Sequence, residues 1–328
     1  MTAARIRDGI ARRLHGPYSR LDRIDERVSL LGERIDHLES RLSVQSRSLM
    51  DEWAASLRTV RGEVHDALRA LGAREGENRS LLRSVRGQPS YERAWTRDRP
   101  LISVTVATLG RPELISRSLP SILGQSHDEL EVVVAADGAA PEIEAEVQAL
   151  GDSRIRYLAL GSRQTWTDDP VKLWLVGATR ARNAALEATR GHWIVDFDDD
   201  DAMRPGCLQA LLETARETRA EAVYGQIRHG DGAERRDIGA FPPRLGQFSW
   251  AAGMYHAGLR FFGRELLAAD LGLPGDWWLA ERMLRAGVRF ALREEVLCDV
   301  FPSQRAADAI SSGAIPWSVD LDPTSERS

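Results

Sequence analysis

The chain of 328 residues is long enough for one large domain and a further segment. Apolar residues make up 43% and charged residues 28%, and no apolar run approaches the roughly 20 residues that span a bilayer, so we expect a soluble protein. The net charge is −5, and residues 98–328 carry 25 basic against 35 acidic residues, which argues against a nucleic-acid-binding surface. Only Cys207 and Cys298 are present, too few for a disulfide framework.

Residues 1–18 are predicted to be a basic N-terminal segment without the apolar stretch of a secretory signal. Ile6, Ile10 and Leu14 recur on one face of a helix whose other positions include several arginines. Such a helix can lie on an anionic membrane surface, and a frayed, solvated terminus fits the same residues. We expect a cytoplasmic protein, with peripheral membrane association at the cytoplasmic face as the open alternative.

Residues 19–88 are predicted to form a helical coiled-coil stalk. Apolar residues recur there at alternating spacings of three and four, at Leu21, Ile24, Val28, Leu31, Ile35, Leu38 and Leu42. The register slips between Leu49 and Leu57 and then resumes, which resembles a stutter. The stripe can pair with a second copy, giving a homo-oligomer, or with itself as a hairpin near Gly72 and Gly76, or it can pack on the domain that follows it in the chain.

A linker at residues 89–99 separates the stalk from a region in which apolar residues no longer follow the heptad spacing. Apolar strands alternate there with helices, which predicts an α/β fold with a mostly parallel central sheet covered on both faces. The expected strands are residues 102–108, 130–136, 154–158 and 192–197. We assign residues 100–303 to this domain and residues 304–328 to a C-terminal tail.

Four consecutive aspartates, Asp198 to Asp201, follow the last of these strands. Ligands of open α/β sheets bind outside the carboxyl ends of the strands, so this is the place to expect chemistry. Adjacent carboxylates repel one another unless a cation or protonation offsets their charge. Mn²⁺ or Mg²⁺ would bind one or two of them together with water and substrate phosphates. A solvated acidic turn before the helix at Pro205 explains the run equally well by itself.

Several motifs, in order and spacing, resemble glycosyltransferase family 2, whose members have the Rossmann-like GT-A nucleotide-sugar fold. The resemblance covers about residues 100–300. It is carried by the opening strand and turn, the strand that ends in Asp-Gly, the Ala-Arg-Asn helix, the strand that delivers Asp-x-Asp and, more loosely, the Glu-Asp helix, at residues 104–114, 132–138, 177–186, 191–201 and 275–287.

This resemblance implies transfer of a sugar from a nucleotide-diphosphate donor, with a UDP-sugar expected, to an acceptor hydroxyl with inversion. The acceptor would be a glycan, a lipid-linked glycan or another hydroxyl compound, in glycan or polysaccharide biosynthesis. Asp276 stands in the place of the catalytic base, and Asp198 and Asp200 in the place of the Asp-x-Asp pair that holds a divalent cation, Mn²⁺ or Mg²⁺.

The other candidate residues would bind the two substrates. On the donor side they are Thr108, Asp137, Arg182, Asp198 and Asp199. Arg182 could pair with the diphosphate or simply answer an acidic neighbour. On the acceptor side the candidates are His256, Trp277 and Trp278, where an indole can stack on a sugar ring and one of the two is expected in the core. His256 could equally be a structural histidine.

The chain departs from the family pattern in three places. Ala136 replaces the first aspartate of Asp-Asp-Gly, Gly275 replaces the glutamate before the expected base, and residues 296–303 offer no histidine. These departures motivate one alternative, a catalytically inactive scaffold of the same fold. A second alternative is a nucleotidyltransferase, but the turn after the first strand holds only Gly110 and Arg111 instead of a glycine-rich phosphate loop.

Overall fold

The computed structural model describes residues 27–42, 44, 50, 53, 55–57, 59–61, 72–163, 166–230 and 235–301. The chain divides into two compact units, Met1–Gly72 and Ala73–Ser328, and each is treated by itself. The expected basic segment at residues 1–18 and the tail at residues 304–328 lie outside the described residues. Within the described part, no helix is both long and apolar enough to cross a membrane.

In the first unit, every described residue from 27 to 61 is helical, and the longest described stretch is the helix at residues 27–42. The apolar side chains of the heptad stripe are exposed on it, with Val28, Leu31, Ile35, Leu38 and Leu42 between 54% and 64% accessible. A helix is therefore present where the sequence predicts one. Its pairing partner stays a prediction.

The second unit begins earlier than the expected domain start at residue 100. A helix runs over residues 72–86, followed by α2 (Arg93–Thr96). Leu82, Tyr91 and Trp95 are buried, since their side chains pack into the apolar clusters of this unit. The segment assigned from the sequence to the end of the stalk and the linker thus forms part of the core. Gly76 lies inside the helix, so no hairpin turn occurs there.

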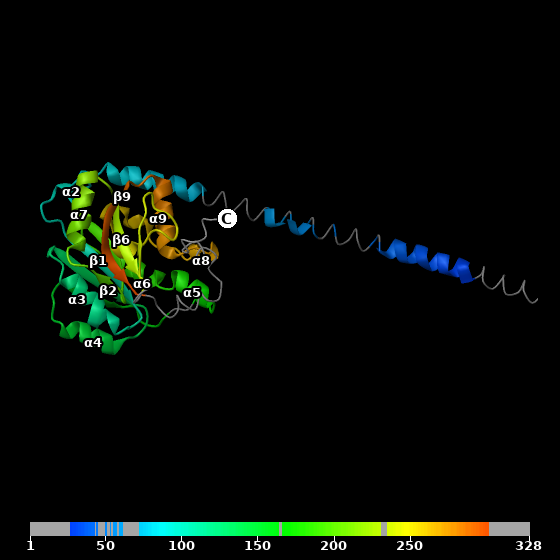
Figure 1. Cartoon of the computed structure of the whole chain (residues 1–328), viewed down its shortest axis with the longest axis horizontal. Coiled ribbons are helices and arrows are strands. Elements are labelled where there is room, and N and C mark those ends of the chain that lie inside the picture. Colours follow the sequence, from blue (N-terminus) through cyan, green and yellow to red (C-terminus); the bar gives the residue numbers. More distant parts are fainter. Residues whose placement is uncertain are drawn as a thin grey trace, which may run out of the picture. The chain divides into compact units, whose positions relative to one another are not determined.

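A nine-stranded sheet has the order β3-β2-β1-β4-β8-β6-β9-β5, with β7 paired to β6. Figure 1 labels four of these strands, β1, β2, β6 and β9. Four strands at one end are parallel: β1 (Ile102–Thr108), β2 (Leu130–Ala136), β3 (Ile155–Ala159) and β4 (Trp193–Asp198). They match the strands expected from the sequence. The β-branched and apolar runs of β1, β2 and β4 are buried on both faces, as central parallel strands require.

The other half of the sheet is mixed. It contains β5 (Ala202–Met203), β6 (Ala222–His229), β7 (Arg236–Ile238), β8 (Gly253–His256) and β9 (Phe290–Val300). The strand β8 runs antiparallel to both β4 and β6, whereas β6 and β9 are parallel. The strands β5, β7 and β8 are only two to four residues long. Strands of this length are too short for the spacing of apolar residues in the sequence to reveal them.

Helices and helical turns cover both faces of the sheet. In chain order they are η1 (Leu114–Ser118), α3 (Leu119–Leu123), α4 (Pro141–Ala149), α5 (Pro170–Val176), α6 (Thr179–Glu187), α7 (Cys207–Thr218), η3 (Trp250–Ala252), η4 (Ala257–Phe262), α8 (Leu267–Asp270) and α9 (Gly275–Ala286).

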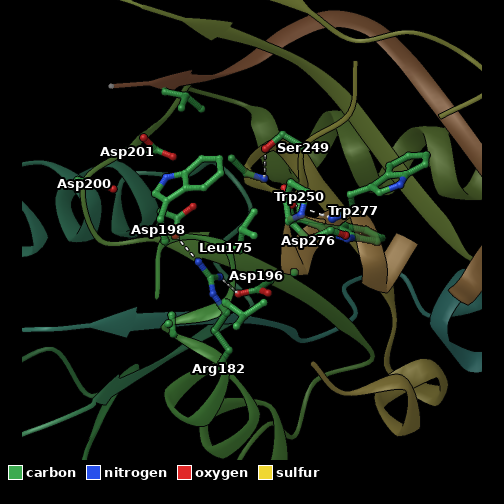
Figure 2. Close-up of a pocket in the computed structure, with 18 of the residues that line it drawn as sticks. Leu175, Arg182, Asp196, Asp198, Asp200, Asp201, Ser249, Trp250, Asp276 and Trp277 are labelled. Carbon is green, nitrogen blue, oxygen red and sulfur yellow. Dashed lines mark hydrogen bonds and ion pairs between the residues drawn. The ribbon is translucent and has the colours of Figure 1, made fainter. Parts of the chain in front are cut away.

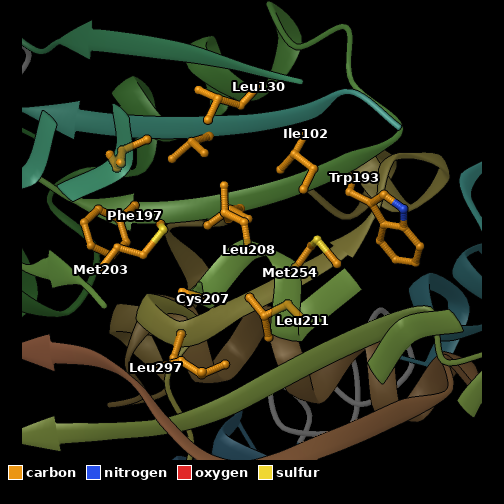
Figure 3. Packing of buried hydrophobic residues seen from close by; sticks show 14 of the residues in the cluster. Ile102, Leu130, Trp193, Phe197, Met203, Cys207, Leu208, Leu211, Met254 and Leu297 are labelled. Carbon is orange, nitrogen blue, oxygen red and sulfur yellow. The ribbon is translucent and has the colours of Figure 1, made fainter. Parts of the chain in front are cut away.

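Alternate strand residues face two separate layers. Val104 and Val106 of β1 pack in the cluster that contains α3 and α7, part of which is drawn in Figure 3, while Ala107 packs against α6. Further along the sheet, Ile194 and Tyr224 contact the layer that contains α9 and the helix at residues 72–86. The α/β class with both faces covered, predicted from the sequence, is confirmed.

Candidate active site

The strand ends that should carry the chemistry meet at one edge of the sheet. In the parallel register, Ala107 of β1 is opposite Asp198 of β4, and Thr108 is opposite Ala136 of β2. A cavity of about 410 Å³ opens beside Asp198. The sheet therefore brings the aspartate run to the position where α/β proteins bind their ligands.

The four aspartates of the run have different surroundings. The side chains of Asp198 and Asp200 line the cavity and are 44% and 20% exposed. Asp199 is buried and accepts a hydrogen bond from the Thr108 hydroxyl at 2.6 Å. Asp201 is buried as well, and its carboxylate accepts from the backbone amide of Phe301 at 3.0 Å. The Asp-x-Asp pair is thus the accessible part of the run.

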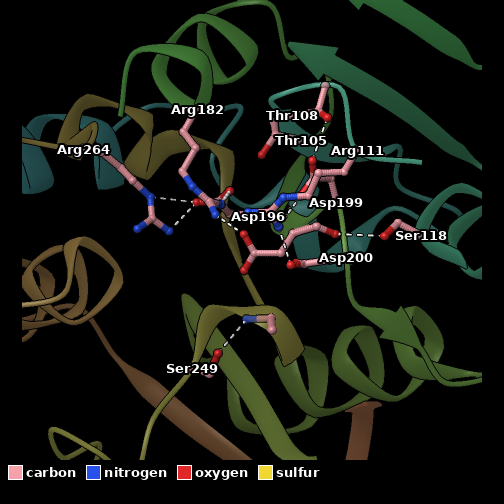
Figure 4. A network of polar contacts seen from close by, with 12 residues as sticks. Thr105, Thr108, Arg111, Ser118, Arg182, Asp196, Asp199, Asp200, Ser249 and Arg264 are labelled. Carbon is pink, nitrogen blue, oxygen red and sulfur yellow. Dashed lines mark hydrogen bonds and ion pairs between the residues drawn. The ribbon is translucent and has the colours of Figure 1, made fainter. Parts of the chain in front are cut away.

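Arginines neutralise these carboxylates from two sides (Figure 4). From α6, the Arg182 guanidinium donates to both Asp196 and Asp198. The second oxygen of Asp196 accepts from Arg264, at 2.9 Å from Nε and 2.5 Å from Nη2. On the other side, Arg111 donates to Asp199 and Asp200. Burial alone would raise the pKa of Asp196, but Arg182 and Arg264 hold it below its ordinary value.

At Asp200 and Asp201, the last two residues of the run, the arginines do not fully offset the negative charge. Burial, joined by the charge of Asp198, raises the pKa of Asp200 to about 6 despite the opposing charge of Arg111. Burial and neighbouring carboxylates also raise the pKa of Asp201 well above its ordinary value. Excess negative charge in a partly desolvated place favours a cation as an additional neighbour.

The oxygen donors fit a hard divalent cation whose shell a substrate completes. No group of three or more His, Cys, Asp or Glu side chains among the described residues is arranged to hold a metal alone. Mg²⁺ and Mn²⁺ sites commonly use one or two carboxylates and take the remaining oxygens from water and phosphate. Asp198 and Asp200 would supply those carboxylates. A diphosphate beside them would complete such a site.

The opposite wall of the cavity comes from α9 and η3. Figure 2 shows Trp250, Asp276 and Trp277 across from Asp198, Asp200 and Asp201. The Asp276 carboxylate lies in the first turn of α9, where it accepts from the Trp277 amide at 2.7 Å. Its backbone carbonyl accepts from the Trp250 indole at 3.0 Å. Burial raises the pKa of Asp276, and the charge of Asp198 acts in the same direction.

Not every residue predicted for the site reaches the cavity. Arg182, Asp198, Asp200, Asp276 and Trp277 line it. The side chains of Thr108 and Asp199 bind each other, and Asp137 accepts from Arg180 at 3.1 Å. Their predicted donor contacts stay predictions.

The two remaining acceptor-side candidates lie in the core. His256 stacks on Trp95 with ring centres 4.9 Å apart, and its Nε2 is 3.0 Å from the Tyr91 carbonyl oxygen. Burial lowers its pKa to about 4. Trp278 is buried and donates to Glu265 at 3.0 Å. Neither residue lines the cavity, because aromatic packing holds the His256 ring inside the domain and the Trp278 indole is buried against Glu265.

Sequence reasoning missed several residues of the cavity. Asp196 offered a signal, since a charged residue inside a buried strand needs partners. Arg264 offered none. The Nη1 atom of Arg264 lies 3.6 Å from the position that a Cβ on Gly275 would occupy. The carboxylate that Arg264 binds belongs to Asp196. His229 of β6 also lines the cavity. It pairs with Val300 of β9 and so lies beside residues 296–303, the segment in which the sequence has no histidine.

Part of the cavity wall, including the aspartate run, lies within a segment that matches a known family, whereas Arg111 and Asp276 lie outside it. Residues 174–267 match the family model described as Glycosyl transferase family 2, and this segment contains Arg182, the aspartate run and Arg264. The α/β fold of the GT-A type expected from the sequence is confirmed, and a helical segment precedes it in the chain.

Two curated relatives illustrate the similarity. Succinoglycan biosynthesis protein ExoO of Rhizobium meliloti is 34% identical over 128 residues, which is 39% of this chain and 32% of the relative. GalNAc(5)-diNAcBac-PP-undecaprenol beta-1,3-glucosyltransferase of Campylobacter jejuni is 30% identical over 128 residues, 38% of each chain. The chain thus aligns with about a third of the length of the relatives it matches.

Solved structures with a similar arrangement are more distant in sequence. S. aureus TarS 1-349 in complex with UDP-GlcNAc has a TM-score of 0.47 at 15% identity, covering 62% of this chain and 59% of that one. Mannosyltransferase PcManGT from Pyrobaculum calidifontis, in complex with GDP-Man and Mn2+, has a TM-score of 0.48 at 18% identity and covers 76% of each chain.

Proposed function

Because this chain carries a glycosyltransferase family 2 segment, we propose that it transfers a sugar from a nucleotide-diphosphate donor to an acceptor hydroxyl with inversion at the anomeric carbon. One observation carries the proposal. The accessible carboxylates of Asp198 and Asp200 and the carboxylate of Asp276 line opposite walls of one cavity. That arrangement leaves space between a diphosphate-binding wall and a candidate base.

On the donor wall, Asp198 and Asp200 would hold a divalent cation, Mn²⁺ or Mg²⁺, together with the donor diphosphate. When bound, such a cation stabilises the negative charge that develops on the leaving diphosphate. Arg111 and Arg182 already lie on these carboxylates. They can exchange part of their contacts for phosphate oxygens when the donor enters.

On the acceptor wall, Asp276 would accept the proton of the attacking hydroxyl. The new bond joins the acceptor oxygen to the anomeric carbon, while the bond from that carbon to the phosphate oxygen breaks and its electron pair leaves with the diphosphate. A raised pKa improves a carboxylate as a base near neutral pH, and burial raises the pKa of Asp276. Trp277 offers an apolar ring for a sugar face.

The names of relatives suggest the substrate class. One relative from Escherichia coli is a UDP-Glc:alpha-D-GlcNAc-diphosphoundecaprenol beta-1,3-glucosyltransferase, and the Campylobacter jejuni relative also carries undecaprenol in its name. We therefore propose a UDP-hexose donor and a glycan acceptor, lipid-linked in the first instance. Work on such an acceptor would place the protein at the cytoplasmic face of a membrane.

The test compares the protein with Asp276→Asn in the presence of nucleotide sugars and Mn²⁺. Wild-type protein should release the nucleoside diphosphate, and chelation with EDTA should stop it. Without its base, Asp276→Asn should turn over roughly 100-fold more slowly or worse. The matched control is Asp98→Asn, an exposed aspartate outside the cavity, which should be unaffected.

Two outcomes would contradict the proposal. Release of free pyrophosphate when a nucleoside triphosphate and a sugar 1-phosphate replace the nucleotide sugar would indicate a nucleotidyltransferase. Absence of turnover with every nucleotide sugar, from a protein that unfolds cooperatively, would favour an inactive scaffold.

A further inference from the structure

The helix at residues 27–42 presents an apolar stripe that its own unit leaves uncovered. Val28, Leu31, Ile35, Leu38 and Leu42 lie on one face and are more than half exposed. Burial of such side chains is the main source of stability in helix pairs, and exposed apolar stripes of this length mark interaction surfaces. The spacing of three and four residues repeats in the sequence just before it, at Leu21 and Ile24.

The side-chain shapes along the stripe select the number of strands. In heptad notation, Val28, Ile35 and Leu42 occupy a positions, two of them β-branched, and Leu31 and Leu38 occupy d positions. In parallel coiled coils, β-branched residues at a combined with leucine at d favour two strands over three or four. The stripe therefore fits one further helix of the same kind.

The flanking charges select the direction of the partner helix. The g positions carry Arg27, Arg34 and Arg41, and the e positions carry Gly32 and Glu39. In a parallel pair each g residue faces the e residue five positions later on the other chain, so Arg34 would meet Glu39 of a second copy. In an antiparallel pair, g faces g and arginines would oppose arginines.

We propose that residues 27–42 pair with the same residues of a second copy of this chain, as a parallel, in-register, two-stranded coiled coil. The opposite charges of Arg34 and Glu39, which meet twice when two identical chains pair in parallel, make a second copy the occupant. The parallel direction is a more specific statement than self-association in general. The proposal is independent of the transferase activity, because none of these residues belongs to the cavity.

The first experiment measures the mass of the full chain by light scattering coupled to gel filtration. We expect twice the chain mass of 36.4 kDa. The double variant Leu31→Asp, Leu38→Asp introduces carboxylates into the seam of the dimer and should return the monomer mass. The matched control is Leu30→Asp, a leucine of similar exposure, 55%, at the c position outside the seam, which should stay dimeric.

The second experiment tests direction with charge reversal, read as the dimer dissociation constant from sedimentation over a concentration series. Arg34→Glu should weaken a parallel dimer by roughly threefold to tenfold, because the introduced carboxylate would face Glu39 of the other copy. The swap Arg34→Glu with Glu39→Arg should restore the affinity. Tighter association of Arg34→Glu would indicate antiparallel pairing and overturn the proposed direction. A monomeric wild-type chain, or a trimer or tetramer, would overturn the dimer itself.

Discussion

Arg182 joins two carboxylates that differ in their roles. It donates to Asp196, which is buried, and to Asp198, which is open to the cavity. A fully charged pair of aspartates two residues apart on one strand would be unfavourable without this guanidinium. The same guanidinium thus stabilises the end of β4 and orients a carboxylate of the proposed donor site.

Arg182→Met should therefore destabilise the protein as well as impair donor binding. Its removal leaves Asp196 with Arg264 as its remaining cation and Asp198 without the arginine that binds it, and the loss of these charged hydrogen bonds should cost roughly 1–3 kcal/mol. Equilibrium unfolding in urea measures it. The control is Arg293→Met, which removes an exposed partner of Glu295 and should cost about 1 kcal/mol or less. Equal effects of the two variants would refute the structural role of Arg182.

Glu221 links the chain before the sheet to the sheet itself. Its buried carboxylate accepts from Arg86 at 2.7 and 2.6 Å, from the Tyr91 hydroxyl at 2.5 Å and from the Arg289 amide at 2.9 Å. Burial alone would raise the pKa of Glu221, but these donors outweigh it and hold the pKa below its ordinary value.

A depressed carboxylate pKa gives stability that is present above the ordinary pKa of glutamate and is lost as the pH falls through the folded-state value. Glu221→Gln should thus melt well below wild type at pH 7, and the difference between the two proteins should narrow as the pH falls below the glutamate range. Melting temperatures measured from about pH 7 to about pH 3 check the trend. A difference that stays constant over this range would show that the carboxylate charge is not what matters.

At the scale of elements, the pairing of β6 with β9 depends on a close approach. A Cβ at Gly225 would lie 2.5 Å from the Leu297 Cδ1 and 3.1 Å from the Glu295 carbonyl oxygen. The register of the two strands also shifts beside this residue. Only glycine lets β9 pass so near while Leu297 stays in the core.

Gly225→Ala should consequently destabilise the protein by roughly 1–3 kcal/mol through overpacking. Gly76→Ala is the matched control, because a Cβ there meets nothing within 4 Å and the residue lies inside a helix. Alanine at that position should be neutral or stabilise by about 0.5–1 kcal/mol. Urea unfolding of both variants tests the pair, and a neutral Gly225→Ala would mean that the strands can move apart without cost.

The parallel half of the sheet could be predicted from the sequence, and the other half could not. Strands β1, β2 and β4 are long buried runs followed by polar residues, which is a strong local signal. By contrast, β8 has four residues and takes its place only through pairing with β4 and β6. The site divides in the same way: Asp198 and Asp200 follow a strand in sequence, whereas Arg264 reaches Asp196 through tertiary folding alone.

At the scale of the molecule, the boundary between the two units lies at Gly72. Residues 73–99 belong to the second unit because Leu82, Tyr91 and Trp95 are buried in it. The recurrence of apolar residues at spacings of three and four continues past Gly72. The sequence therefore predicts the end of the stalk at residue 88, later than the boundary in the structure. A heptad stripe looks the same whether it faces another chain or its own domain.

Two truncations test this boundary. A chain that starts at Ala73 should keep cooperative unfolding with a melting temperature near that of the full chain. A chain that starts at Pro100 should fail to fold, because losing each large buried side chain costs roughly 3 kcal/mol or more against a total stability of about 5–15 kcal/mol. Scanning calorimetry separates the two, and a shorter chain that melts like the full protein would refute the assignment.

The aromatic lining of the cavity also gives the protein an optical property. Of its nine tryptophans, Trp174, Trp250 and Trp277 line the cavity. Indole emission shifts with the polarity and charge of its surroundings, so a ligand that displaces water there should alter the ultraviolet fluorescence of the entire protein. Candidate nucleotides and glycans can then be ranked by titration of the unlabelled chain, with no need to know in advance which reaction they undergo.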